Sequence, residues 1–194
     1  MLIGLMGYAG VGKSTVARIL CAEHGFVAPH IASPIKTMLG ALLRSTGYDA
    51  QTVARFVDGD LKREIIPELG VTATEAQQTI GDWGRVCRPD LWLSLWLAKA
   101  DAIIAAGGRV VQESVRFADE ATAIKARGGI LIEVRRPGFG PLSAHASEAV
   151  PSAGDIILDN CNCPTDLARQ CACSIGNLCL QTPRFKGHFG TFAR

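Results

Sequence analysis

Near its start the chain has a short apolar run followed by a segment of helical spacing. Residues 2–6 (LIGLM) form the run, which Gly7 ends, and this pattern favours a strand buried on both faces of a parallel sheet. In residues 13–24 the apolar side chains recur three to four positions apart, and Gly25 follows as a stop residue. The first 25 residues therefore predict a strand, a glycine loop and a helix.

Similar patterns continue along the chain. Apolar spacing predicts further helices at 35–43, 73–80 (after the capping box TATE at 72–75), 90–106, 117–124 and from 164 onward. Buried strands are predicted at 109–114, 130–134 and 155–158. Alternation of strands and helices predicts an α/β fold with a doubly wound parallel sheet of about five strands. We interpret 1–180 as one domain with a helical insertion at about 33–106, and assign no structure to the tail 181–194.

Composition and charge narrow the class of partner. The chain has 194 residues, 48% of them hydrophobic and 20% charged, which suits one folded domain. Lys and Arg number 20 and Asp and Glu 18, so the net charge of +2 argues against stable nucleic-acid binding over a broad surface. Any anion site is expected to be local. The sequence leaves homodimer formation open.

No membrane segment or export signal is expected. Mean hydropathy is +0.20, but the most apolar stretch, 91–106, contains Ser94, Lys99 and Asp101 and is too interrupted for a spanning helix. The N-terminus has no basic region before its apolar run, so it does not resemble a signal peptide. These features predict a cytoplasmic protein, with the seven cysteines in the reduced state.

Five of those cysteines lie close together near the C-terminus. They are Cys161, Cys163, Cys171, Cys173 and Cys179. Zinc sites usually pair cysteines two to four residues apart, whereas these pairs have one residue between them. On a helix, Cys171 and Cys173 would point about 200° apart, which is awkward for a shared ligand. We therefore favour structural or free cysteines over a metal site.

The glycine loop carries the clearest chemistry. Residues 7–14 (GYAGVGKS) match G-x-x-x-x-G-K-[ST] at every fixed position. Glycines let backbone N–H groups turn inward around phosphate oxygens, and the following helix adds its positive N-terminal end. The predicted contacts to ATP come from Gly7, Ala9, Gly10, Val11, Gly12, Lys13, Ser14 and Thr15. Lys13 would neutralise the β- and γ-phosphates, and the Ser14 hydroxyl would bind Mg²⁺.

The phosphate loop alone does not separate kinases from other nucleotide hydrolases. GTPases of this fold need an N-K-x-D string to bind guanine, and the sequence has none. The chain is also short for a motor domain. A compact chain with its own arginines favours phosphoryl transfer to a small molecule.

Four later segments, in order, resemble the phage-type deoxynucleoside monophosphate kinases. They are ASPIK (32–36); QTIGDWGR (78–85) with PDLW (89–92); VRFADE (115–120); and RRPG (135–138) with HASE (145–148) and DIILDN (155–160). Together with the phosphate loop they cover most of residues 1–160. The resemblance implies a P-loop NTPase fold that transfers the γ-phosphate of ATP to a deoxynucleoside 5′-monophosphate.

Two phosphate-bearing substrates need separate cationic groups, and the resemblance suggests which residues supply them. For the acceptor the candidates are Lys36, Arg85, Arg88, Trp92, Arg116 and Glu148. Arg116 follows a strand end, where ligands collect in open α/β sheets. Lys13, Arg116, Arg135 and Arg136 are the candidates for transition-state charge neutralisation, the last two at the start of a closing lid at about 135–148. His145 would brace that lid with Glu148. Trp83 and Trp92 are favoured as core residues over base-stacking ones.

The sequence departs from the family pattern at two places. Ser114 stands where the family has an aspartate at the strand end, and Glu113 beside it should point to the opposite face. Glu75 to Gln77 stand where the family pattern has an arginine. Three hypotheses therefore stay open: a deoxynucleoside monophosphate kinase, a P-loop kinase for another acceptor (a nucleoside, sugar acid or coenzyme precursor), and a nucleotide-binding regulatory module without transfer activity.

Overall fold

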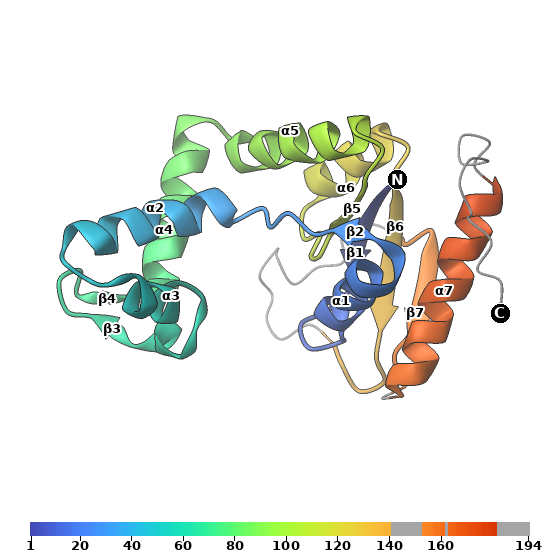
Figure 1. Cartoon of the computed structure of the whole chain (residues 1–194), viewed down its shortest axis with the longest axis horizontal. Helices are drawn as coiled ribbons and strands as arrows, with labels where there is room; N and C mark the ends of the chain where they lie inside the picture. Colours follow the sequence, from blue (N-terminus) through green and yellow to red (C-terminus); the bar gives the residue numbers. More distant parts are fainter. Residues whose placement is uncertain (141–152, 162, 182–194) are drawn as a thin grey trace. The chain divides into compact units, whose positions relative to one another are not determined.

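A computed structural model describes residues 1–140, 153–161 and 163–181 of the chain (Figure 1). The chain divides into two compact units. The first contains Met1–Ala28 and the chain from Ile104 onward, and the second contains Pro29–Ile103. In the described residues, no helix is long and apolar enough to cross a membrane.

The first unit is built on a five-stranded parallel sheet. Its strands are β1 (Leu2–Met6), β2 (Phe26–Val27), β5 (Arg109–Gln112), β6 (Ile130–Arg135) and β7 (Ile156–Asp159). The strand order is β2-β5-β1-β6-β7, and every neighbouring pair is parallel. Because the strands are parallel, the segments that follow β1, β5, β6 and β7 all begin at the same edge of the sheet. In open α/β sheets this carboxyl edge is where ligands bind.

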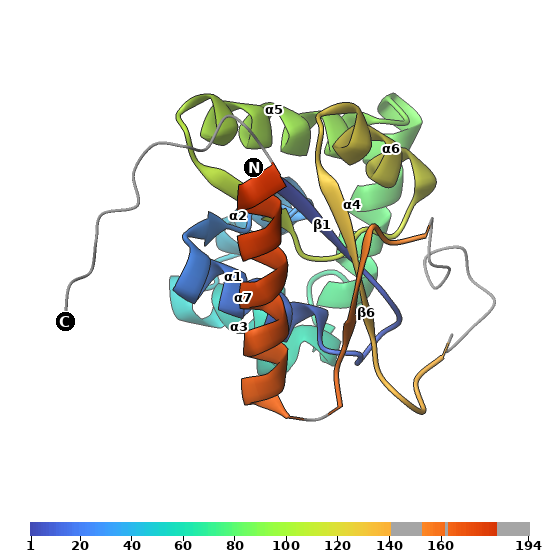
Figure 2. The same cartoon turned by 90° about the vertical axis from the view of Figure 1, so that its right-hand side faces the viewer.

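Helices cover both faces of this sheet, as its apolar strands require. Ile3 and Leu5 of β1 pack into a core with Val16 of α1 (Lys13–His24) and Leu167 of α7 (Pro164–Gln181). Gly4, which points to the other face, lies against Ile124 of α6 (Ala118–Ala126). The helices α1 and α7 contact each other along one face (Figure 2). The sheet is therefore doubly wound, as predicted.

The second unit is mostly helical. It contains α2 (Ser33–Ser45), α3 (Ala50–Asp58), the 3₁₀ turn η1 (Asp60–Arg63), the two-residue strands β3 (Ile65–Ile66) and β4 (Val71–Thr72), α4 (Ala73–Cys87) and most of α5 (Leu91–Ala105). Its core joins Leu39 and Leu43 of α2 to Phe56 of α3. The predicted capping box at the start of α4 is present. The Thr72 side chain accepts a hydrogen bond from the backbone N–H of Glu75, and the Glu75 side chain accepts one from the backbone N–H of Thr72.

Helices α4 and α5 approach closely at one point. Trp92 is buried, its Nε1–H donates to the Gly81 carbonyl at 2.8 Å, and its ring lies directly over Gly84. The core prediction is therefore confirmed for Trp92. It is wrong for Trp83, whose side chain is 54% exposed, because it lies on the outer side of the same helix.

Candidate functional site

The phosphate loop connects β1 to α1 at the carboxyl edge of the sheet. Gly7, Gly10 and Gly12 have φ values of +131°, +78° and +108°, a backbone region that favours glycine. A Cβ at Gly7 would also lie 2.3 Å from the backbone oxygen of Val134, so no side chain fits there. Gly12 is the N-cap of α1 and has no side chain, which leaves the N–H groups of the first helical turn available to an anion.

Cationic and amide side chains hold the carbonyl groups of this loop. The Lys13 ammonium donates to the Gly7 oxygen at 2.7 Å and to the Tyr8 oxygen at 2.8 Å. Asn160, which directly follows β7, donates from Nδ2 to the Val11 oxygen at 2.8 Å. The loop is thus fixed by its own lysine and by a residue 149 positions away in the chain.

Arg136 reaches the loop from the end of β6. Its Nη1–H donates to the Gly10 oxygen at 3.3 Å, and its guanidinium carbon lies 4.6 Å from the centre of the Phe139 ring. The same ring lies against Gly10. Arg136 and Phe139 therefore lie on the phosphate loop, and Arg136 is one of the predicted charge-neutralising residues.

Arg135 makes a different set of contacts. Its Nε–H and Nη2–H donate to the two carboxylate oxygens of Glu133 at 2.7 and 3.0 Å. This bidentate hydrogen bonding and the carboxylate charge raise the pKa of Arg135 above its usual value. Residues 141–152, which include His145, Glu148 and the rest of the predicted lid, lie outside the described residues.

The segment after β5 presents Arg116. Its Nε–H donates to Ser114 Oγ at 3.2 Å, and its backbone N–H donates to Glu120 at 2.7 Å. The Glu120 side chain also accepts the Phe117 N–H at 3.4 Å and closes the N-terminus of α6. Glu120 is buried, and this burial raises the pKa of its carboxyl group despite the two N–H donors.

Glu113, the residue before Ser114, affects the Cys21 thiol. Its carboxylate contributes to raising the pKa of Cys21 in α1, an effect whose larger cause is burial of that thiol. Ser114 contacts Arg116. That Glu113 and Ser114 point to opposite faces of the sheet stays a prediction.

In the second unit each predicted acceptor-binding cation has an acidic neighbour. Lys36 Nζ lies 2.5 Å from Asp58, Arg85 Nη1 lies 3.0 Å from Asp82, and Arg88 Nε lies 2.9 Å from Asp90. Arg88 also donates to Ser94 Oγ. The Arg85 and Arg88 pairs are exposed, and pairs of this kind contribute little to stability, about 0–1 kcal/mol, whereas the Lys36 side chain is only 20% exposed.

Ser14 and Thr15 occupy the first turn of α1. Ser14 is exposed and Thr15 is half-buried. This position at the helix N-terminus gives the Ser14 hydroxyl access to an ion held beside bound phosphates. Its role as a magnesium ligand stays a prediction.

The C-terminal cysteines do not gather around one point in the described residues. Cys171 is buried in the core, and this raises its pKa to about 11, whereas Cys173 on the same helix is exposed. The predicted divergence of these two side chains is confirmed. Among the described residues there is no group of three or more His, Cys, Asp and Glu side chains placed to hold a metal ion.

Asn160 was not singled out as a site residue by the sequence, apart from its place in the DIILDN segment. The available signal was its position, since a polar residue directly after a parallel strand lies at the ligand-binding edge of the sheet. Its partner, Val11, could not be identified from spacing. Phe139 was missed for the same reason, because its contact with Gly10 joins two distant loops.

The parallel sheet, the glycine loop after its first strand and the lysine at the start of the following helix define the P-loop NTPase fold, and solved structures of kinases share it. A sugar kinase from Janibacter sp. HTCC2649 is similar with a TM-score of 0.51 and 17% identity, covering 96% of this chain and 98% of that one. Dephospho-CoA kinase from Campylobacter jejuni is similar with a TM-score of 0.50 and 14% identity, covering 91% and 96%. At these identities the likeness shows the fold.

Sequence comparison gives the family. No protein-family model matches the chain. A protein of Acanthamoeba polyphaga mimivirus named "Putative deoxynucleotide monophosphate kinase" is 31% identical over 169 residues, an alignment that covers 76% of this chain and 80% of that protein. The chain belongs to the same nucleotide kinase family, a group of phosphotransferases.

Proposed function

We propose that this protein transfers the γ-phosphoryl group of ATP to a deoxynucleoside 5′-monophosphate and forms the diphosphate. An oxygen of the acceptor phosphate attacks the γ-phosphorus, the bond to the β-phosphate bridging oxygen breaks, and ADP leaves. The observation that carries the proposal is the glycine loop, whose carbonyl groups are held by side chains beside an uncapped helix N-terminus. The name of the mimivirus relative supports the choice of acceptor.

The donor side would be formed by the loop and the first turn of α1. The residues concerned are Gly7, Ala9, Gly10, Val11, Gly12, Lys13, Ser14 and Thr15. A Cβ at Gly12 would lie 2.5 Å from Asn160 Nδ2, so the loop has no room for side chains at this position. Mg²⁺, held by the Ser14 hydroxyl, would neutralise phosphate charge when bound. Lys13 would leave the Gly7 and Tyr8 carbonyl groups and bind the β- and γ-phosphates.

Catalysis of phosphoryl transfer is mostly positioning and charge neutralisation. In our proposal Arg136, already in contact with Gly10, neutralises the transferring group, and Arg135 joins it by exchanging Glu133 for phosphate. Arg116 holds the acceptor phosphate. Ser114 would keep Arg116 in place by accepting a hydrogen bond from its side chain, and Glu120 by accepting one from its backbone N–H.

The second unit has three further cations that we propose as acceptor-binding residues. Lys36, Arg85 and Arg88 are proposed to bind the acceptor, each by exchanging its acidic neighbour for a phosphate or sugar oxygen. Trp92 would contribute by fixing α4 against α5, since its indole N–H is engaged with Gly81. Glu148 remains part of the proposal as a lid residue.

The test is a coupled assay of ADP release with ATP, Mg²⁺ and each deoxynucleoside monophosphate in turn. We expect turnover with at least one acceptor. The variant Lys13→Ala should lose about 10² to 10³ in kcat/KM, the usual effect of removing one charge-stabilising donor. Arg18→Ala provides a matched control, because Arg18 is an exposed cation on the same helix. Absence of turnover with every acceptor would refute the proposed substrate.

A second candidate function is phosphorylation of a different small molecule, and Ser114 is the observation that favours it. Where the family has a carboxylate, this chain has an uncharged hydroxyl in contact with Arg116. Thermal-shift screening of nucleosides, sugar acids and coenzyme precursors with a non-hydrolysable ATP analogue would identify such an acceptor. Binding of ATP without transfer to any of them would instead support a regulatory module.

A further inference from the structure

The loop-facing side chain of Asn160 has a geometric consequence for the phosphate site. Its Nδ2–H donates to the Val11 carbonyl oxygen at 2.8 Å. In a trans peptide unit, the carbonyl of one residue and the N–H of the next point in opposite directions. Holding the Val11 carbonyl toward Asn160 therefore directs the Gly12 N–H away from Asn160. Gly12 is the last glycine of the phosphate loop, directly before Lys13.

Gly12 is the position at which this orientation needs to be imposed. With no side chain and a φ of +108°, glycine has a wider range of backbone conformations than any other residue. The Asn160 amide lies against it so closely that a Cβ at Gly12 would meet Nδ2 at 2.5 Å. Asn160 thus both selects one peptide orientation and occupies the space on that side of the loop.

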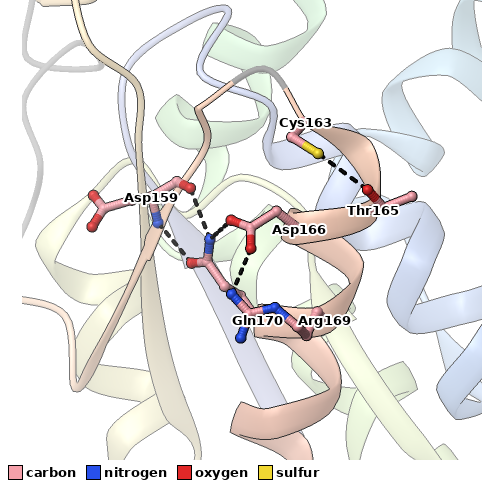
Figure 3. A network of polar contacts seen from close by, with 6 residues as sticks. All are labelled: Asp159, Cys163, Thr165, Asp166, Arg169 and Gln170. Carbon is pink, nitrogen blue, oxygen red and sulfur yellow. Dashed lines mark hydrogen bonds and ion pairs between the residues drawn. The ribbon is translucent and has the colours of Figure 1, made fainter.

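Asn160 is itself held in place from two directions. Its backbone N–H donates to the Arg135 carbonyl oxygen at 2.8 Å, which fixes it to the end of β6. The preceding residue, Asp159, exchanges two hydrogen bonds with the Gln170 side chain of α7, each 3.0 Å long (Figure 3). Asp166 in turn accepts a hydrogen bond from the Gln170 amide at 2.8 Å. The end of β7 is therefore attached to both β6 and α7.

We propose that Asn160 is a positioning residue of the donor site, which orients the Val11–Gly12 peptide so that the Gly12 N–H faces the phosphates of the nucleotide. Gln170 supports it by fixing the backbone of Asp159. This inference rests on the proposed function only for the identity of the donor. The proposed role of Asn160 concerns binding of the polyphosphate group, which can be measured without an acceptor and without turnover.

The test is calorimetric titration with Mg²⁺ and inorganic tripolyphosphate, ATP or GTP. A neutral hydrogen bond usually contributes about 0.5–1.5 kcal/mol, which corresponds to a change of roughly twofold to twelvefold in an equilibrium constant. Asn160→Leu, similar in size but without the donor, should therefore bind all three ligands several-fold more weakly, by a common factor. Asn177→Leu is the matched control, because Asn177 is exposed on α7. Its affinities should equal those of the wild type.

A purely structural role would not produce this pattern. We expect Asn160→Leu to keep the wild-type circular dichroism spectrum, to raise KM for ATP and to leave KM for the acceptor unchanged. Wild-type tripolyphosphate affinity in the folded variant would overturn the proposal. So would weakening confined to ATP, because Asn160 would then contact the base.

Two further variants keep the proposal testable if Asn160→Leu does not fold. Asn160→Ser retains a shorter donor and should bind tripolyphosphate with intermediate affinity, whereas full affinity would overturn the proposal. Gln170→Leu should weaken tripolyphosphate binding in the same direction by a smaller factor. If tripolyphosphate binds as expected but no deoxynucleoside monophosphate is phosphorylated, only the proposed acceptor fails. If the wild type does not bind tripolyphosphate, the positioning role and the donor site fail together.

Discussion

The Arg116 guanidinium donates a hydrogen bond to the hydroxyl of Ser114, two residues earlier, at 3.2 Å. In the family that the sequence resembles, the position of Ser114 is occupied by an aspartate. A serine retains a hydrogen-bond acceptor for the arginine but adds no charge beside it. The contact with Ser114 therefore brings no negative charge to the Arg116 guanidinium, which in our proposal binds the acceptor phosphate.

Removal of the Ser114 hydroxyl should raise KM for the acceptor and leave KM for ATP nearly unchanged. Ser114→Ala frees the Arg116 side chain, so KM for the acceptor should rise several-fold, consistent with the loss of a hydrogen bond of about 0.5–1.5 kcal/mol. KM for ATP should change less than twofold. Thr122→Ala removes a hydroxyl from the exposed side of α6 and should change neither constant. An equal rise in both constants would contradict a specific role for Ser114.

Glu120 should give the folding stability a distinct pH dependence. Burial raises its pKa in the folded protein, so the folded state holds this proton more tightly than the unfolded state. The resulting stabilisation is complete below the ordinary pKa of glutamate and is lost as pH rises through the raised value. Urea unfolding of Glu120→Gln over this interval should show a smaller decrease in stability than the wild type. Parallel pH profiles of the two proteins would contradict the assignment.

The backbone role of Glu120 can be separated from its titration. Glu120→Ala leaves the N–H groups of Arg116 and Phe117 without their carboxylate acceptor and should cost about 1–3 kcal/mol at neutral pH. Glu120→Gln keeps an acceptor oxygen and should cost less. The difference in urea midpoint between these two variants measures this cap directly.

Gly84 should be essential to the packing of α4 against α5. A Cβ there would lie 2.1 Å from the Trp92 ring, so Gly84→Ala should destabilise the protein by about 1–3 kcal/mol through overpacking. Gly176→Ala is the matched control, since it lies inside α7 with no atom within 4 Å of the added Cβ. It should stabilise the helix by about 0.5–1 kcal/mol. Thermal or urea unfolding of the two variants should therefore give shifts of opposite sign.

The cysteines should differ widely in reactivity. Hydrogen bonds from the Thr165 hydroxyl and from backbone N–H groups lower the pKa of the exposed Cys163 thiol, whereas burial raises the pKa of Cys171 to about 11. Because the thiolate is the reactive form, iodoacetamide at neutral pH should modify Cys163 well before Cys171. Peptide mass spectrometry would measure both rates. Unfolding in urea should remove the difference, and equal rates in the folded protein would contradict it.

The sequence predicted those elements whose signal is local and long enough to repeat. The strand at 2–6 and the helices beginning at 13 and 164 agree with the structure to within a residue or two. The strands β2, β3 and β4 were missed because two residues cannot display an alternating pattern. Helix α3 was also missed, although Val53, Phe56 and Val57 have helical spacing and Asp49 caps it.

In the candidate site too, the sequence predicted the part that is contiguous and missed the contacts between distant residues. The phosphate loop is contiguous in sequence, so eight residues were enough to predict its place between a strand and a helix. The contacts of Asn160 with Val11 and of Arg136 with Gly10 join positions more than 120 residues apart, and no spacing rule connects them. The ion pair of Lys36 with Asp58 spans a shorter separation but joins two different helices, so the pattern of either helix alone does not predict it. Such contacts depend on how the elements pack, which the sequence pattern does not specify.

Strands β2 and β5 pair side by side although 81 residues separate Val27 from Arg109, and nearly all of that length belongs to the second unit. In the topology of the sheet, the whole second unit is part of one crossover connection between β2 and β5. Because the entropic cost of closing a connection grows only slowly with its length, such a crossover can be lengthened, shortened or replaced while the same two strands still pair. The topology thus allows the second unit to diverge in evolution while the sheet that carries the phosphate loop is kept.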